Sequence, residues 1–128
     1  MGSKPEDQSE AGLGKESQQG FLIMEKFKTG SVRDNREGKG RYDLIPPEAV
    51  HELAIHFETG AKKYGDRNWE LGQPISRIMD SALRHAFSYM AKKKDENHLA
   101  AAAWNLMAAM TIRARAKAGT LPKELDDL

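Results

Sequence analysis

The chain has 128 residues and a mass of 14.3 kDa, the size of one ordinary domain. Twenty Lys and Arg residues against 19 Asp and Glu residues give a formal net charge of +1, so no global field attracts DNA or an anionic membrane. Cysteine is absent, which excludes disulfides, thiolate nucleophiles and Cys-ligated metal centres. No run reaches the ~20 apolar residues of a membrane span. We therefore expect a cytoplasmic protein with neither a membrane nor a nucleic acid as its partner.

The first 44 residues are poor in apolar side chains. Residues 1–20 have only three clearly apolar ones and are expected to form a disordered tail. Residues 21–44 mix a short apolar run with glycine turn signals and predict an irregular arm. Four basic residues either contact phosphate oxygens or form a solvated basic loop: Arg33, Arg36, Lys39 and Arg41.

Residues 45–122 predict a helical domain, and residues 123–128 a short acidic tail. The first helix is expected over residues 47–59, with Gly60 as a left-handed C-cap. The second should run from an N-cap at Ser76 to about residue 92. The third should cover residues 98–116, with Asn97 available as N-cap and Gly119 as C-cap.

The apolar patterns of these helices predict how they pack. The first helix should face the core with Val50, Leu53, Ala54 and Phe57. The third reads HLAAAAWNLMAAM and is apolar or small on nearly every side, which is typical of a buried helix. Two neighbouring helices cannot cover it completely. We therefore expect an all-α fold, a small helical bundle completed by homo-oligomerisation, with an irregular N-terminal arm.

Several polar residues on these helices can carry chemistry. His98 and Asn105 share one face of the third helix, where they either meet a ligand or are satisfied inside the core. On the second helix, Asp80 and Arg84 lie at i, i+4 spacing beside His85. This pair either belongs to a site or is an ion pair on a solvated flank.

Glu48 and Glu52 of the first helix also lie at i, i+4 spacing. They either reach one hard divalent cation together or simply solvate a helix face. His51 and His56 flank these acids and are expected to be surface or internally satisfied histidines.

The loop after the first helix combines cations, aromatic rings and an amide around two glycines. Lys62, Lys63 and Arg67 can neutralise phosphate oxygens, while Asn68 can hydrogen-bond a base or sugar and Trp69 can stack on a base. The alternative is that the tryptophan fills the core and the lysines complement the end of the first helix.

Four segments in order, RYDLIPPEAV, GAKKYGDRNW, DSALRH and HLAAAAWN, resemble the phage dATP/dGTP diphosphohydrolase N-terminal family. That family is associated with MazG-like all-α nucleotide pyrophosphohydrolases, and the similarity spans about residues 29–110. The resemblance implies hydrolysis of a purine deoxynucleoside triphosphate, dGTP or dATP, to the monophosphate and pyrophosphate. It also implies a need for Mg²⁺, or for Mn²⁺ or Co²⁺ instead, and a place in phage nucleotide metabolism in the host cytoplasm.

On this basis the residues take hypothetical roles. The metal carboxylates would be Glu48, Glu52 and Asp80, with Asp95 or Glu96 as further candidates. Catalysis would involve Glu48, Asp80, His85 and His98, the histidines acting as ligands or proton-transfer groups. Phosphates would be held by Lys62, Lys63, Arg67 and Arg84, and the nucleoside would face Asn68, Trp69 and Asn105.

Two other functions remain open. An HD-type triphosphohydrolase would release triphosphate, and His85, His98 and nearby acids imitate its ligand set, although no adjacent His-Asp pair is present. A non-catalytic helical module that binds a nucleotide or a protein partner would use Glu48, His98 and Asn105 structurally.

Overall fold

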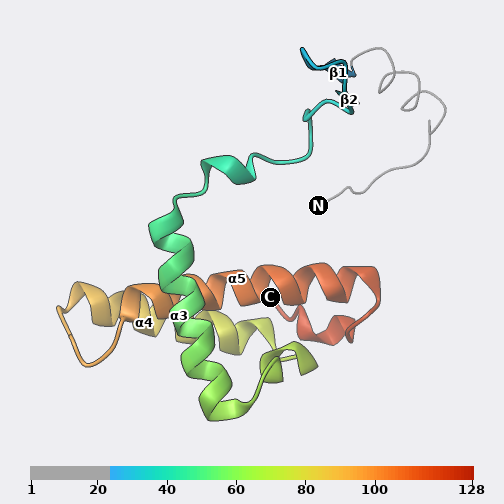
Figure 1. Ribbon diagram of the computed structural model, residues 1–128. Helices are drawn as coiled ribbons and strands as arrows, with labels where there is room; N and C mark the ends of the chain where they lie inside the picture. Colours follow the sequence, from blue (N-terminus) through green and yellow to red (C-terminus); the bar gives the residue numbers. More distant parts are fainter. Residues whose placement is uncertain (1–23) are drawn as a thin grey trace. The chain divides into compact units, whose positions relative to one another are not determined.

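The computed structural model describes residues 24–128, which divide after Leu44 into two units (Figure 1). The expected disordered tail, residues 1–20, and the first three residues of the arm lie outside the described residues. In the first unit, β1 (Glu25–Lys26) pairs antiparallel with β2 (Val32–Arg33), and a 3-10 helix, η1 (Tyr42–Leu44), follows. Apart from these elements, residues 24–44 form turns and segments without regular secondary structure, as expected for an irregular arm.

The second unit begins with helix α3 (Pro47–Tyr64), which runs one turn beyond its expected end at residue 59. Gly60 does not stop the helix, because one interior glycine costs only about 1 kcal/mol and a better cap follows. Gly65 has a φ of 94°, and its N–H donates to the carbonyl of Ala61. Lys62 and Lys63 consequently lie in the last turn, where they complement the helix dipole.

The expected core face of α3 is only partly covered. Leu53 is half-buried, whereas Val50, Ala54 and Phe57 are exposed, and no residue of this helix is fully buried. Figure 1 shows the reason: α3 lies across α5 instead of along it, so the two helices meet over a short crossing. The 3-10 helix η2 (Asn68–Leu71) follows and brings Trp69 against the core.

Helix α4 (Ile75–Met90) starts with Pro74 at its N-cap, so the expectation that Ser76 caps it is wrong. A distant carboxylate satisfies this helix end instead. The N–H of Ser76 donates to Asp127 Oδ1 at 2.9 Å and its hydroxyl donates to Oδ2 at 2.6 Å. The acidic C-terminal tail, which includes the 3-10 helix η3 (Lys123–Leu125), is thereby fastened to α4. At the other end α4 stops two residues early, where Lys92 adopts a φ of 64°.

Helix α5 (His98–Ala118) has the expected caps. Asn97 Oδ1 accepts from the N–H of Ala100 at 3.0 Å, and Gly119 closes the helix in the left-handed conformation at φ 86°. The helix runs antiparallel to α4, and the core lies between them (Figure 1). The core cluster consists of Ile75, Ile78, Ala108, Ala109 and Ile112, against which Trp69, Met79, Trp104, Leu121 and Leu125 pack.

The all-α fold class is confirmed, but α5 is not buried on every side. Leu99, Leu106 and Met110 are about half exposed, because α3 and α4 together cover only part of the helix circumference. Within residues 24–128, no helix has the length and apolar character that crossing a membrane requires.

Candidate functional site

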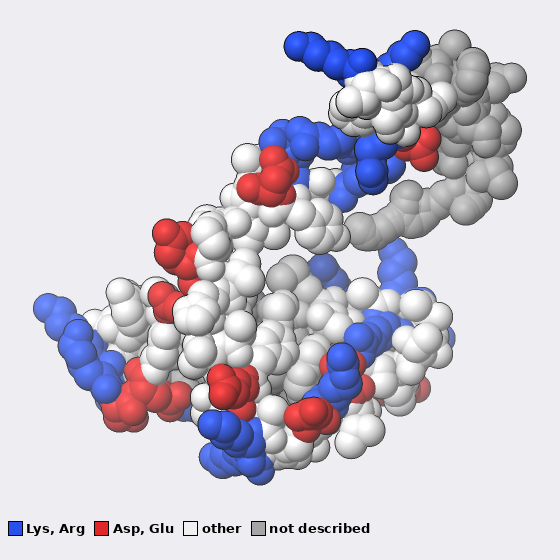
Figure 2. All heavy atoms as spheres, viewed as in Figure 1, with Lys and Arg blue, Asp and Glu red and all other residues white. Residues whose placement is uncertain are grey.

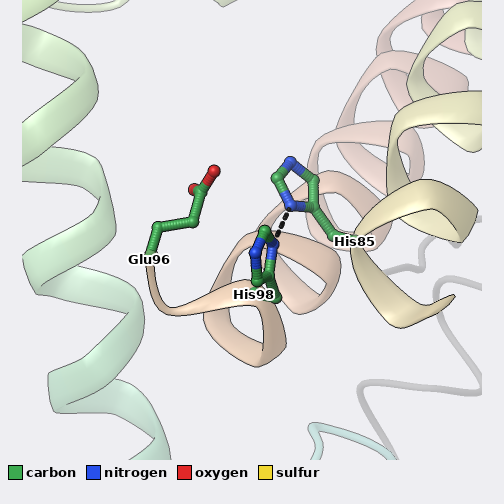
Figure 3. A group of neighbouring side chains, drawn as sticks. All are labelled: His85, Glu96 and His98. Carbon is green, nitrogen blue, oxygen red and sulfur yellow. Dashed lines mark hydrogen bonds between the residues drawn. The ribbon is translucent and has the colours of Figure 1, made fainter. Parts of the chain in front are cut away.

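Two histidines from different helices meet at the end of the α4–α5 pair. His85 lies near the C-terminus of α4 and His98 is the first residue of α5, so the antiparallel packing brings them together. Their Nδ1 atoms are 2.9 Å apart and their ring centroids 5.2 Å apart (Figure 3). A contact of this length requires one ring to donate and the other to accept.

A carboxylate decides which ring accepts. Nε2 of His98 lies 2.8 Å from Oδ1 of Asp95, and because an ionised carboxylate only accepts, Nε2 carries the proton. His98 therefore presents the lone pair of Nδ1, and His85 donates to it. The hydrogen bond from His98 also holds the pKa of Asp95 below its ordinary value. His98 is buried, with 6 % of its side chain exposed, so its ring is fixed in this orientation.

Glu96 completes a group able to hold a metal ion. One ligand atom each from His85, Glu96 and His98 lies within 4.8 Å of the other two. Figure 3 shows the carboxylate of Glu96 extending from the segment before α5 towards the two rings. Metal-binding histidines usually donate their second ring N–H to a carboxylate or carbonyl. His98 donates its Nε2–H to the carboxylate of Asp95 in this way. The donor set therefore fits a divalent cation, which would take the place of the hydrogen bond between the two Nδ1 atoms.

A third histidine, from α3, belongs to the same neighbourhood. Burial lowers the pKa of His56, and the charge of Glu96 opposes that shift. Burial also lowers the pKa of His85, against the charge of Glu96 and with help from the charges of Arg84, His98 and His56. Both imidazoles are thus kept neutral at neutral pH, the form in which imidazole binds a metal ion or accepts a proton.

Of the three expected metal carboxylates, Glu52 is hydrogen-bonded to the segment that carries this group. Its Oε1 accepts from Nδ2 of Asn97 at 2.9 Å, which ties α3 to the residue that caps α5. Glu48 and Asp80 are exposed on α3 and α4, and neither makes a hydrogen bond or ion pair with another residue of the described chain. The structure does not bring the three carboxylates together in the group of metal ligands.

The expected phosphate-binding residues are all exposed, and each has a local contact. Lys62 pairs with Glu58 at 3.6 Å, and Lys63 lies over the ring of Tyr64 at 5.2 Å. Arg67 pairs with Glu70 at 2.8 Å; that carboxylate also binds Arg115 at 2.9 Å. Arg84 donates to the hydroxyl of Ser81 at 3.3 Å. On the face shown in Figure 2, basic and acidic side chains are interspersed over residues 45–128.

The residues expected to face the nucleoside lie in different environments. Trp69 packs against the core and forms an edge-on pair with Trp104 at 5.6 Å, as the structural alternative predicts. Asn105 is buried and donates to the carbonyl of Ala101, one turn earlier in its own helix. Asn68 is exposed in η2. Among the described residues, Nε1 of Trp104 is buried without a hydrogen-bond partner.

Sequence reasoning did not identify His56 as part of the site. Its ring centroid lies 5.5 Å from that of Trp104, so His56 lies at the contact between α3 and α5. The effect of its charge on the pKa of His85 places it close to the two other histidines. The available signal was the i, i+4 spacing of Glu52 and His56, which places both on one face of α3. The role of Asp95 behind His98 was also missed, because an i, i+3 relation across a helix start is not a regular helical pair.

Fold and site together define a small all-α protein with a histidine and carboxylate group suited to a divalent cation. The family described as dATP/dGTP diphosphohydrolase, N-terminal, matches residues 29–120, and the chain belongs to this family. No curated protein and no solved structure matches the chain.

Proposed function

We propose that the protein hydrolyses purine deoxynucleoside triphosphates, dGTP and dATP, to the monophosphate and pyrophosphate. We place the divalent cation for this reaction at His85, Glu96 and His98. The family supports the substrate class and the reaction. The observation that carries the proposal is the convergence of three ligand atoms within 4.8 Å, with Asp95 hydrogen-bonded behind His98.

The ligand atoms indicate which cation this group prefers. Two imidazole nitrogens favour the later first-row transition ions, such as Co²⁺, and the carboxylate also suits Mn²⁺. Mg²⁺ prefers an octahedral shell of oxygens and usually enters a site with the phosphates of its substrate. We therefore propose Mn²⁺ or Co²⁺ at the histidines, with Mg²⁺ as the ion that accompanies the triphosphate.

The protein's own residues would divide the work around this cation. A bound divalent cation would supply positive charge that neutralises phosphate oxygens. It would also supply Lewis acidity that makes water a better nucleophile at the α-phosphorus. Asp95 holds the ring of His98 in the tautomer that presents Nδ1. His56, neutral because it is partly buried, is proposed to accept a proton from the attacking water.

The remaining assignments stay predictions of this proposal. Lys62 and Lys63 at the C-terminal end of α3 and Arg84 beside His85 are the proposed phosphate contacts. Arg67 would have to exchange its partner Glu70 for a phosphate oxygen. The setting we propose is phage nucleotide metabolism in the host cytoplasm.

One assay tests the reaction. The full chain is incubated with each deoxynucleoside and ribonucleoside triphosphate and with Mg²⁺, Mn²⁺ or Co²⁺, and the products are identified by mass spectrometry. Monophosphate and pyrophosphate from dGTP or dATP support the proposal. Triphosphate would indicate the HD-type reaction instead, and no turnover with any cation would indicate a non-catalytic module.

Variants locate the cation. Glu96→Gln should abolish turnover, whereas Glu124→Gln, the same change on exposed η3, should leave it unchanged. Full activity of Glu96→Gln would refute the site. Glu48→Gln and Asp80→Asn test the carboxylates expected from the sequence, and that assignment fails if both keep metal-dependent turnover.

A further inference from the structure

Three consecutive lysines lie in the connection between α4 and α5. Lys92, Lys93 and Lys94 follow the end of α4 and directly precede Asp95 and Glu96. All three are exposed, and none makes an ion pair or a side-chain hydrogen bond with another residue of the range 24–128. We call residues 92–94 the basic turn. Its charges are therefore free to meet an anion from solution.

The backbone of the basic turn closes the end of α4. The N–H of Lys93 donates to the carbonyl of Ser88 at 3.1 Å, and the N–H of Lys92 donates to the carbonyl of Tyr89 at 2.9 Å. These two bonds define a Schellman motif, whose left-handed position is usually occupied by glycine. Lys92 occupies that position with a φ of 64°, where a side chain strains the backbone. Strain of this kind is common at functional sites.

The basic turn lies beside the proposed cation site, which consists of His85, Glu96 and His98. The hydrogen bond from His98 is the main cause that lowers the pKa of Asp95, and the positive charge of Lys93 lowers it further. Figure 2 shows basic side chains gathered over the end of the helical unit where α4 turns into α5, next to acidic ones. Lys93 is therefore close enough to act electrostatically on a residue that supports the cation site.

The cation site needs positive charge from its surroundings to bind a phosphate chain. It includes the carboxylates of Glu96 and, behind His98, of Asp95, whose charges a divalent cation would only cancel. A triphosphate brings several further negative charges. Burial lowers the pKa of His85 and the charge of Arg84 lowers it further, so Arg84 supplies one positive charge beside the site. The basic turn supplies three more.

We propose that the basic turn binds the β- and γ-phosphates of the triphosphate substrate and the pyrophosphate that they become. In the proposed reaction, the oxygen of a water molecule bonds to the α-phosphorus and the water loses a proton. The bond from the α-phosphorus to the oxygen that bridges to the β-phosphate breaks, and pyrophosphate leaves with the bonding electrons. Negative charge builds up on this leaving group, where ammonium groups stabilise it. The inference rests on the proposed function for the identity of the anion.

The structural alternative is that the lysines only complement the dipole of α4. They lie beyond the last turn of the helix and are exposed, a position in which the dipole interaction is weak. The two roles predict different outcomes. A dipole role requires that loss of the charges lowers stability and leaves anion binding unchanged, whereas a phosphate-binding role requires that loss of the charges weakens anion binding.

Isothermal titration calorimetry of the full chain with inorganic pyrophosphate and Mg²⁺ measures the anion site without turnover. Alanine at all three positions of the basic turn should raise the dissociation constant of pyrophosphate by about tenfold, because each exposed charge contributes only a small factor. Arginine at the same positions should retain the affinity. A matched control removes three exposed basic residues at and beyond the other end of α5: Arg113→Ala, Lys117→Ala and Lys123→Ala. Unchanged affinity of the triple-alanine variant, or an equal loss in the control, would overturn the proposal.

The variant Lys92→Gly separates binding from folding. Glycine relieves the strain at φ 64°, so this variant should unfold at a higher urea concentration than the wild type. It should nevertheless bind pyrophosphate about threefold more weakly, because one exposed charge is lost. A lower urea midpoint together with unchanged pyrophosphate affinity is the result that the dipole role predicts, and it would overturn the proposal.

A second ligand and a separate turnover assay identify the bound group. The monophosphate dGMP lacks the β- and γ-phosphates, so the triple-alanine variant should bind it as tightly as the wild type does; an equal loss of dGMP affinity would overturn the assignment. Turnover of dGTP is measured independently. Weakened pyrophosphate binding without turnover of any triphosphate by the wild type would support the basic turn and refute only the proposed reaction. Wild-type affinity in a fully active triple-alanine variant would refute the basic turn alone.

Discussion

Replacing Asp95 by asparagine tests whether the hydrogen bond behind His98 tunes a metal ligand. The substitution keeps the shape of the side chain and an oxygen that accepts from Nε2 of His98, but it removes the negative charge. Loss of a group that accepts a hydrogen bond from a metal-binding histidine typically lowers metal affinity by 10- to 100-fold. Because 71 % of the Asp95 side chain is exposed, water competes for the same N–H, so we expect the lower end of that range, about tenfold.

Isothermal titration calorimetry with Mn²⁺ or Co²⁺ measures this effect on the purified chain. Asp95→Ala, which removes the acceptor altogether, should weaken binding more than Asp95→Asn does. In turnover assays the asparagine variant should need about tenfold more cation for half-maximal rate, while its rate at saturating cation stays close to that of the wild type. Asp126→Asn has the same charge change at an exposed site in the tail and serves as the control. Equal affinities of Asp95→Asn and the wild type, or an equal loss in the control, would refute the reasoning.

Three further predictions concern stability, each measured by urea unfolding. Ile112 is fully buried at the centre of the core, so Ile112→Ala should lower the unfolding free energy by about 3 kcal/mol; a loss under about 1 kcal/mol would mean that the core closes around the cavity. Asn97→Ala removes the N-cap of α5 and should cost about 1 kcal/mol, whereas Asn97→Ser, which also loses the hydrogen bond to Glu52 but keeps a capping oxygen, should cost less; equal losses would exclude capping as the cause. Burial lowers the pKa of His56 below 6.5 in the folded protein, so the unfolded chain binds more protons below that pH. Stability should therefore be fully present above about pH 6.5 and decline as the pH falls, and His56→Gln should flatten this profile; unchanged slopes would contradict the role of burial.

The local pattern of the sequence was sufficient to predict most helices. Apolar periodicity, the prolines at residues 46 and 47, the Asn97 cap and the Gly119 stop all act within a few residues, so they do not depend on the rest of the fold. Two of the ends that were predicted wrongly depended on competition or on distant residues. Gly60 is followed by a stronger stop at Gly65, and the start of α4 is satisfied by Asp127 from the C-terminal tail.

In the candidate site, too, the sequence predicted some features and the packing of the helices decided the others. The lack of cysteine leaves imidazole and carboxylate groups as metal ligands, the few polar residues of the third helix already indicated His98, and the polar group on the second helix indicated His85. Periodicity identifies the face of a helix that a residue occupies, but it does not identify the residue of another helix that it meets. The contact between His85 and His98, the support from Asp95 and the approach of His56 are set by how three helices pack, so only the tertiary structure decided them.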